Sequence, residues 1–256
     1  MALALITGAS SGIGMELAKV HAAKGGDLFL VARSGAVLRD LKQKLEAAHR
    51  ITVHVFEQDL GLPNAAQKVY EETTRLGLQV DYLINNAGFG DYGFFAETSW
   101  PKEETMIQLN ITALTHLCKL YLPEMVGRKQ GRILNVASTA AFQPGPKMAV
   151  YFATKAYVLH FTEALSNELA EQGVTATALC PGATESNFAK AADVEAAGLF
   201  KNKKLPSSRS VAEYGYSAML KGKTLAIHGF MNNLLARTTG FLPRALVTKV
   251  TRMVIG

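Results

Sequence analysis

Short apolar runs alternate with longer amphipathic stretches along most of the chain. The apolar runs cover Leu3–Ile6, Asp27–Val31, Ile51–Phe56, Asp81–Asn85, Arg132–Val136 and Val174–Leu179, and a last one covers Thr224–His228. Between them, apolar residues recur at helical spacing, as in Gly12–Lys24 and Val37–Ala48. Strands that alternate with helices in this way form parallel sheets through right-handed crossovers. The pattern therefore predicts an α/β fold.

The predicted strands are continuous apolar runs and do not alternate between apolar and polar residues. Such runs are typical of strands that are covered on both faces. We therefore expect a doubly wound parallel sheet with helices on both faces. A length of 256 residues suits one such sheet, and we expect a single domain over residues 1–256.

Two segments depart from the alternation of strands and helices. The first is polar, rich in lysine and interrupted by glycine and proline, and we predict a long substrate loop over about residues 184–210. The second, residues 229–256, is predicted to be helical. Its last part is apolar with three interleaved basic residues, Arg244, Lys249 and Arg252. It could pack on the core, on a second subunit or on a membrane surface, and we favour packing over membrane contact.

The composition narrows the class of protein. A hydrophobic fraction of 48% and a charged fraction of 19% are those of a globular protein with a large core. The formal net charge of +6 comes from scattered residues, so we expect an anionic small molecule and no nucleic acid. Cys118 and Cys180 form no metal or redox motif, which predicts reduced thiols and no metal site. No signal peptide is recognisable, and we expect a cytoplasmic protein.

A glycine-rich turn follows the first predicted strand, with the sequence Thr7-Gly8-Ala9-Ser10-Ser11-Gly12-Ile13-Gly14. Glycines let the backbone approach a pyrophosphate, which the amide groups and the helix N-terminus then hold. A connection without a ligand is the alternative. The second strand ends in Arg33 and Ser34, where an NAD site would carry an acidic residue. A cation and a hydroxyl suit the 2′-phosphate of NADP, unless Arg33 is simply a solvated surface residue.

Tyr151 and Lys155 are four residues apart and would lie on one face of a helix. A nearby ammonium group lowers the pKa of a phenol, which suits Tyr151 for proton exchange with an alcohol or carbonyl. Such pairs also occur by chance on many helices. Ser138 lies just past the fifth predicted strand, at the edge where open α/β sheets bind ligands. Asn110 is a polar residue in an apolar, helix-like run, and a satisfied core amide is its plainer interpretation.

Together these residues resemble the short-chain dehydrogenases/reductases, of the classical type and of an NADP-preferring subgroup. The resemblance covers nearly the whole chain and rests on Thr7 to Gly14, Asp59-Leu60, Asn85-Asn86-Ala87-Gly88, Asn110, Ser138, Tyr151, Lys155, Pro181-Gly182 and Thr184. It implies a Rossmann-type sheet of about seven strands in the order 3-2-1-4-5-6-7. It also implies hydride transfer between NADP(H) and a carbonyl or secondary alcohol.

The resemblance further implies a role for each matching residue. Tyr151 would exchange the proton and Ser138 would orient the substrate oxygen. Lys155 would lower the tyrosine pKa and bind the nicotinamide ribose, while Asn110 would support a water in the proton relay. The cofactor would contact Gly8, Ser10, Ser11, Gly12, Ile13, Gly14, Arg33, Ser34, Asp59, Leu60, Asn86, Ala87, Gly88, Tyr151, Lys155, Pro181, Gly182 and Thr184. Members of the family are usually dimers or tetramers, so we expect a homodimer or homotetramer.

Aromatic residues dominate the segments beyond the carboxyl edge of the predicted sheet. The candidate pocket residues are Phe89, Phe94, Phe142, Gln143, Phe188 and Phe200. They predict a lipophilic ketone, aldehyde or secondary alcohol as substrate, although each aromatic residue alone could be ordinary packing. One alternative is a 3-oxoacyl-thioester reductase, whose anionic carrier would suit Lys190, Lys201, Lys203 and Lys204. A non-catalytic NADP(H)-sensing protein is a second alternative, because a fold does not determine a function.

Overall fold

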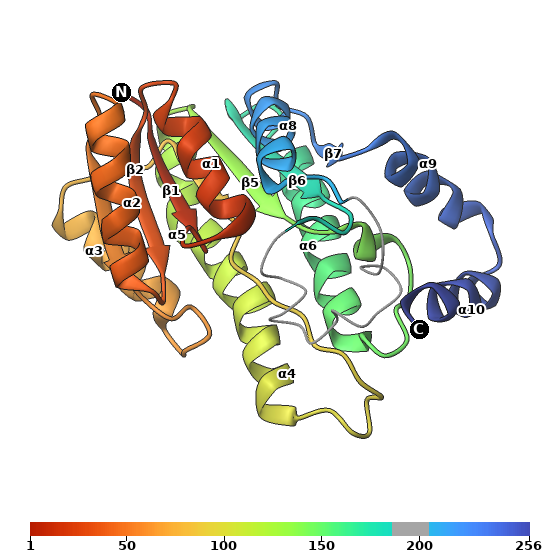
Figure 1. Cartoon of the computed structure of the whole chain (residues 1–256). Helices are drawn as coiled ribbons and strands as arrows, with labels where there is room; N and C mark the ends of the chain where they lie inside the picture. The colour runs from red at the N-terminus through yellow and green to blue at the C-terminus, as the bar shows by residue number, and fades with distance from the viewer. Residues whose placement is uncertain (186–204) are drawn as a thin grey trace.

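The computed structural model describes residues 1–185 and 205–256, which build a seven-stranded sheet (Figure 1). Its strands are β1 (Leu3–Thr7), β2 (Asp27–Ala32), β3 (Val53–Glu57), β4 (Tyr82–Asn85), β5 (Gly131–Val136), β6 (Val174–Cys180) and β7 (Leu225–Ile227). All neighbours are parallel, in the order β3-β2-β1-β4-β5-β6-β7. The predicted α/β class and strand order are thus confirmed. The strand order reverses between β1 and β4, where sheets of this kind open a crevice.

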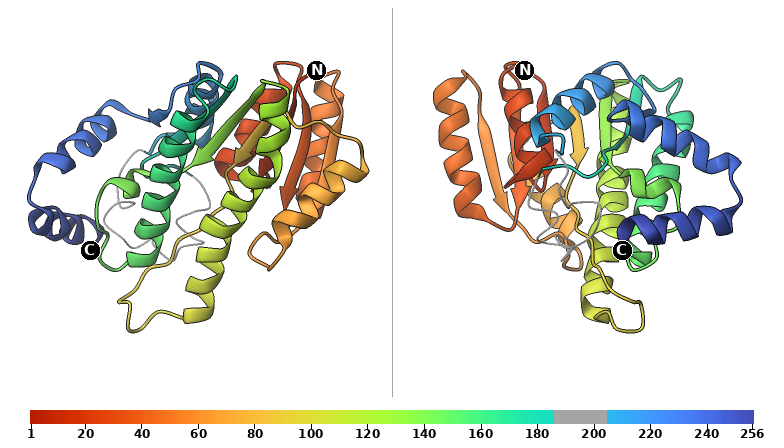
Figure 2. Two further views of the ribbon diagram at one scale, coloured as in Figure 1. Left: turned by 180° about the vertical axis from the view of Figure 1, so that it is seen from behind. Right: turned by 45° about the vertical axis from the view of Figure 1, so that its right-hand side comes forward.

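Helices cover both faces of the sheet (Figures 1 and 2). One face carries α1 (Gly12–Ala22), α2 (Gly35–Ala48) and α8 (Ser208–Leu220), and the other carries α3 (Ala65–Arg75), α5 (Leu114–Gly127) and α6 (Ala149–Glu168). The remaining elements are α4 (Trp100–Ile107), the π-helical segment η1 (Gln108–Ala113), the 3-10 segments η2 (Thr139–Phe142) and η3 (Thr239–Phe241), α9 (Phe230–Thr238) and α10 (Arg244–Ile255). The segment 229–256 is therefore helical, as predicted.

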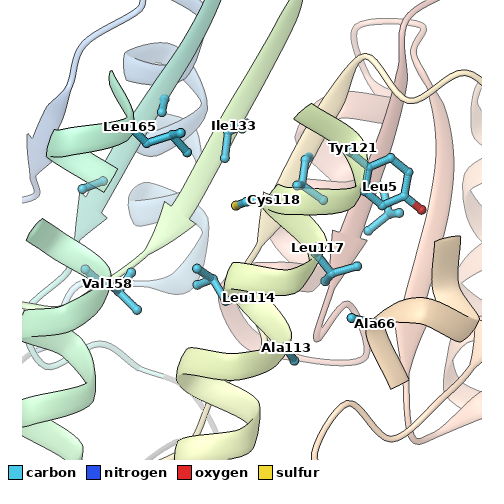
Figure 3. Close-up of a cluster of buried hydrophobic side chains, with 14 of the residues drawn as sticks. Leu5, Ala66, Ala113, Leu114, Leu117, Cys118, Tyr121, Ile133, Val158 and Leu165 are labelled. Carbon is cyan, nitrogen blue, oxygen red and sulfur yellow. The ribbon is translucent and has the colours of Figure 1, made fainter. Parts of the chain in front are cut away.

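Successive residues of β1 point into two different cores. Leu5 belongs to the core on the side of α5, together with Leu117 and Tyr121 (Figure 3). Ile6 belongs to the core on the side of α1 and α2, where it joins Leu17. Because both faces of the strand are buried, neither set of side chains can be polar without cost. This explains the uninterrupted apolar runs in the sequence.

Polar side chains tie the central strands to α6. The Asn85 amide donates to Asn135 Oδ1 at 2.9 Å, which links β4 to β5, and the Asn135 amide donates to Thr162 Oγ1 on α6 at 3.0 Å. All three side chains are buried, where a hydrogen-bonded amide is costly to displace. The row fixes the relative position of β4, of β5, which precedes Ser138, and of α6, which carries Tyr151 and Lys155.

The element boundaries differ from the predicted ones by a few residues. Helix α8 begins at Ser208, because the Ser207 hydroxyl caps it by accepting from the Ser210 N–H at 3.2 Å. The predicted loop 184–210 therefore ends earlier than expected, and its residues 186–204 lie outside the described part of the chain. Both cysteines are free and buried, and burial raises the pKa of each thiol to about 12. Among the described residues, no helix has the length and apolar character that a membrane span requires.

Candidate active site

A cavity of about 380 Å³ lies at the carboxyl ends of the strands. It extends from the glycine-rich turn to the residues that follow β5 and β6. The predicted site residues that line it are Gly8, Ser10, Ser11, Gly12, Ile13, Arg33, Ser34, Asp59, Leu60, Asn86, Ala87, Gly88, Ser138, Tyr151, Lys155, Pro181, Gly182 and Thr184. Gly14 and Asn110 are not among its lining residues. The fold thus gathers loops from along the whole chain at one edge of the sheet.

The glycine-rich turn forms one wall of this cavity. Gly8 and Gly12 have φ values of +66° and +55°, which favour glycine. A Cβ on Gly14 would lie 2.4 Å from the carbonyl oxygen of Gly8, so Gly14 permits close packing of the turn, and its predicted contact with the cofactor stays a prediction. The side chain of Ser11 makes no capping hydrogen bond within the described residues. The amides of the first turn of α1 therefore remain available to an anion, and the turn fits a dinucleotide pyrophosphate.

Thr7 holds the opposite wall in place, a role that was not predicted. Its hydroxyl accepts from the backbone N–H groups of Asn86 and Ala87, both at 3.0 Å. The Asn86 amide in turn donates to the carbonyl oxygen of Thr7 at 3.0 Å. These bonds join the ends of β1 and β4 across the crevice. Thr7 is part of the glycine-rich motif, so its position in that motif was the available signal.

Arg33 and Ser34 lie at the end of β2, where both are exposed and line the cavity. Asp59 lies beside them after β3, and its Oδ1 accepts from the Gly61 N–H at 2.8 Å. Arg39 on α2 is instead paired with Glu57 at 3.7 Å. The guanidinium of Arg33 is thus a cation at the mouth of the cavity, some distance along the crevice from Tyr151.

Tyr151, Ser138 and Lys155 meet at the other end of the cavity, and each is at most 9% exposed. The side chain of Ser138 is hydrogen-bonded to Tyr151, and its hydroxyl also accepts from the Ala140 N–H at 3.1 Å. The Lys155 ammonium donates to the carbonyl oxygen of Val136 at 2.9 Å and lies 5.8 Å from the centre of the Tyr151 ring. The three side chains, predicted from two separate segments, therefore form one group.

Burial controls the protonation of this group. Desolvation raises the pKa of Tyr151 to about 12, although the hydrogen bond from Ser138 acts in the opposite direction. Desolvation likewise lowers the pKa of Lys155 to about 8. In the free protein burial is the dominant influence on the Tyr151 pKa, and the Lys155 ammonium is directed to the Val136 carbonyl. That Lys155 lowers the pKa of Tyr151 stays a prediction.

Asn110 lies in the π-helical segment η1 and is 1% exposed. Its Oδ1 accepts from the Phe89 N–H at 3.2 Å, and its Nδ2 donates to the Phe89 carbonyl and to Thr154 Oγ1, both at 3.0 Å. A Cβ on Gly88 would lie 2.9 Å from Asn110 Oδ1 and 3.3 Å from Lys155 Nζ. Asn110 thus joins the loop that follows β4 to α6, next to Gly88 and Lys155. Its role in a water relay stays a prediction.

The predicted substrate residues fall into three groups. Phe89 and Gln143 line the cavity. Phe94 is 48% exposed and is not a lining residue, while Phe142 packs against the core on the α5 side, so both predictions were wrong. Phe188, Phe200, Lys190, Lys201, Lys203 and Lys204 lie outside the described residues.

Further apolar lining comes from Leu109, Met148 and Phe152. These three residues were not predicted, because in a sequence an apolar lining residue has the same pattern as an ordinary core residue. Thr154, which holds Asn110, was missed for a similar reason, because a single threonine within a helix has no distinct pattern.

Comparison with known proteins assigns the chain to a family. Residues 2–196 match the short chain dehydrogenase family. The chain is 33% identical over 260 residues to the very-long-chain 3-oxoacyl-CoA reductase of Pyrenophora tritici-repentis, and the match covers 97% of this chain and 75% of that protein. The chain belongs to the short-chain dehydrogenase family, and it is an oxidoreductase that acts on a carbonyl or alcohol with a nicotinamide cofactor.

Three solved structures show the same fold. A short-chain dehydrogenase from Sphingobium yanoikuyae in complex with NADPH is 30% identical, with a TM-score of 0.84 over 94% of this chain and 95% of that one. The bulky-bulky ketone specific alcohol dehydrogenase from Comamonas testosteroni is 28% identical, with a TM-score of 0.79 over 94% and 93%. A short chain dehydrogenase/reductase from Burkholderia phymatum in complex with NAD is 25% identical, with a TM-score of 0.80 over 92% of each chain. Similar structures thus contain either cofactor.

Proposed function

We propose that this protein uses NADP(H) to interconvert a lipophilic ketone or aldehyde and the corresponding alcohol, with Tyr151 as the general acid and base. The supporting observation is the continuity of one cavity. It holds the group formed by Tyr151, Ser138 and Lys155 at one end, and Arg33 with Ser34 at the other. A dinucleotide bound along the crevice would place its two ends at these two groups.

The reduction can be followed through the protein's own residues. A bound nicotinamide supplies the hydride that adds to the carbonyl carbon. The Ser138 hydroxyl donates a hydrogen bond to the carbonyl oxygen, on which negative charge develops. The Tyr151 phenol, neutral at physiological pH because its pKa is about 12, transfers its proton to that oxygen and yields the alcohol. The Lys155 ammonium then stabilises the tyrosinate, and the oxidation of an alcohol follows the same path in reverse.

The substrate class is inferred from the lining near Tyr151. Leu109, Met148, Phe152 and Phe89 border the cavity there, and apolar walls favour apolar ligands. The likeness to an alcohol dehydrogenase specific for bulky ketones supports the same class.

The test is a panel of bulky ketones, aldehydes and small polar carbonyl compounds of similar intrinsic reactivity, assayed by NADPH consumption. We expect the highest kcat/KM for the bulky apolar members. Preference for the small polar members would refute the assignment of the substrate.

A second candidate substrate is a 3-oxoacyl thioester. The similarity to the very-long-chain 3-oxoacyl-CoA reductase covers 97% of this chain and favours it. A 3-oxoacyl-CoA and a 3-oxoacyl thioester of a small thiol with the same acyl chain separate the two candidates, because both carry the same activated 3-oxo group and only recognition of the carrier would raise kcat/KM for the CoA compound. The cytoplasmic location and assembly into a homodimer or homotetramer stay predictions, and sedimentation of the purified protein would measure the assembly.

A further inference from the structure

Helices α9 and α10 and the η3 segment between them lie beyond β7 at one end of the molecule (Figures 1 and 2). They present apolar side chains to solvent, which we call the C-terminal apolar surface. Its residues are Phe230, Met231, Leu234, Leu235, Phe241, Leu242, Leu246, Val250, Met253 and Val254. Phe230 and Phe241 are 84% and 89% exposed. An apolar surface of this extent marks an interaction site in a folded protein.

The orientation of α10 is fixed by contacts on its opposite side. Val247, Thr251 and Ile255 are buried, and Ile255 packs in the small cluster that contains Tyr151 and Met148. The carbonyl of Gly256 accepts from the hydroxyl of Tyr92 at 2.8 Å and from the ammonium of Lys147. The predicted packing on the core is therefore correct for one face of α10 only. The face with Leu246, Val250 and Met253 points away from the protein.

The charges of this region have a single sign. Residues 229–256 contain Arg237, Arg244, Lys249 and Arg252, and they contain no aspartate or glutamate. At about 100° per residue, Lys249 falls next to Met253 at the border of the apolar stripe and Arg252 lies about 100° from Met253, whereas Arg244 lies nearly opposite the stripe, beside the buried face. A helix with an exposed apolar stripe bordered by cations is typical of segments that lie in the surface of a membrane.

The same charges disfavour a second copy of the chain as the occupant. A twofold interface brings one patch against its own copy, so the cations that border this patch on one subunit would face the same cations of the other. No carboxylate from residues 229–256 could compensate them. An anionic lipid surface instead attracts every one of these cations.

We propose that the C-terminal apolar surface binds peripherally to membranes that contain anionic lipids. Phe230, Phe241 and Met253 would enter the boundary between headgroups and acyl chains, with Lys249 and Arg252 among the phosphates. Ile255 belongs to the same apolar cluster as Tyr151, so a bilayer at this surface would lie close to the active site. A lipophilic substrate could then reach the cavity from the membrane, a consequence that rests on the proposed function.

The experiment is flotation of the purified full-length protein with vesicles of phosphatidylcholine, with or without phosphatidylglycerol. We expect the protein to float with the anionic vesicles, to float weakly with the neutral ones, and to be released by high salt because screening weakens the attraction. The double variant Phe230→Ser/Phe241→Ser should lower the partition coefficient by about tenfold or more, since it removes two aromatic anchors. The variant Lys249→Glu/Arg252→Glu should abolish the preference for anionic vesicles.

A matched control distinguishes binding through the C-terminal apolar surface from nonspecific hydrophobic adsorption to vesicles. Leu62 and Trp100 are 53% and 59% exposed but lie outside the C-terminal apolar surface, after β3 and at the start of α4. The variant Leu62→Ser/Trp100→Ser should therefore float like the wild type. Titration with NADPH and circular dichroism verify that every variant is folded.

Absence of flotation with anionic vesicles would overturn the proposal. So would equal loss in the control variant, or a homo-oligomer that dissociates in Phe230→Ser/Phe241→Ser without any vesicle binding. Because flotation needs no turnover, a failure of the proposed substrate class would leave this result unchanged.

Discussion

Replacement of Arg33 by alanine should weaken the binding of NADPH while leaving that of NADH nearly unchanged. Arg33 lines the exposed end of the cavity at the end of β2. A hydrogen bond from a guanidinium to a phosphate contributes about 1.5 to 3 kcal/mol. Because Arg33 is exposed and screened by solvent, we take the lower limit of about 1.5 kcal/mol, which corresponds to roughly a tenfold rise in the Kd for NADPH.

Fluorescence titration with each cofactor measures both dissociation constants. The matched control is Arg50→Ala. Arg50 is an exposed arginine that precedes β3, so it lies at the amino ends of the strands, away from the cavity at their carboxyl ends. It should leave both constants within about twofold of the wild type. The effect at Arg33 should also shrink at high salt, because an exposed ion pair is screened. Equal weakening of NADPH and NADH in Arg33→Ala, or no weakening, would refute the reasoning that NADP is the preferred cofactor.

Three further predictions concern other parts of the molecule. Lys155 has a pKa of about 8 in the folded protein against 10.5 when unperturbed, so burial of its charged form destabilises the fold at neutral pH and this cost disappears as the pH rises. Relative to Lys155→Met, the unfolding free energy of the wild type should therefore increase by about 2 kcal/mol between neutral pH and pH 10. Parallel pH profiles of the two proteins in urea unfolding would contradict this. Gly88→Ala should reduce kcat by about tenfold or more with little loss of stability, because its Cβ would lie 2.9 Å from Asn110 Oδ1 beside Lys155; unchanged kcat would show that this packing is loose. Tyr121→Phe should lower the unfolding free energy by about 1 kcal/mol, since the Tyr121 hydroxyl bonds Thr73 Oγ1 at 2.8 Å in the core, and an unaltered urea midpoint would count against that bond.

The fold could be predicted because its signals are local and repeated. Leu5 and Ile6 enter different cores, so burial on both faces appears in the sequence as an unbroken apolar run. The glycine-rich turn was recognisable because backbone conformation restricts residue choice at Gly8 and Gly12. Helix ends were less predictable, since a single cap such as Ser207 decides where α8 begins.

The site was predictable where a residue type is itself required by the chemistry. Tyr151, Ser138 and Arg33 carry groups that few other residues offer, and all three line the cavity. The substrate end was not predictable, because any apolar residue can serve either as lining or as packing. Phe142 packs in the core, whereas Met148 borders the cavity. The protonation of Tyr151 also depends on its burial. Burial results from tertiary packing and cannot be predicted from the spacing of Tyr151 and Lys155.

The central claim is that Tyr151 exchanges the proton during hydride transfer, and the variant Tyr151→Phe tests it most directly. The control is Tyr157→Phe on the same helix, whose hydroxyl lies 3.1 Å from Thr115 Oγ1 and whose side chain is 39% exposed. Single-turnover reduction of the best ketone and NADPH titration are measured for both variants. Tyr151→Phe should bind NADPH within about threefold of the wild type and react more slowly by about a thousandfold, in the range of general acid–base catalysis, while Tyr157→Phe should match the wild type. Turnover by Tyr151→Phe near the wild-type rate would contradict the account.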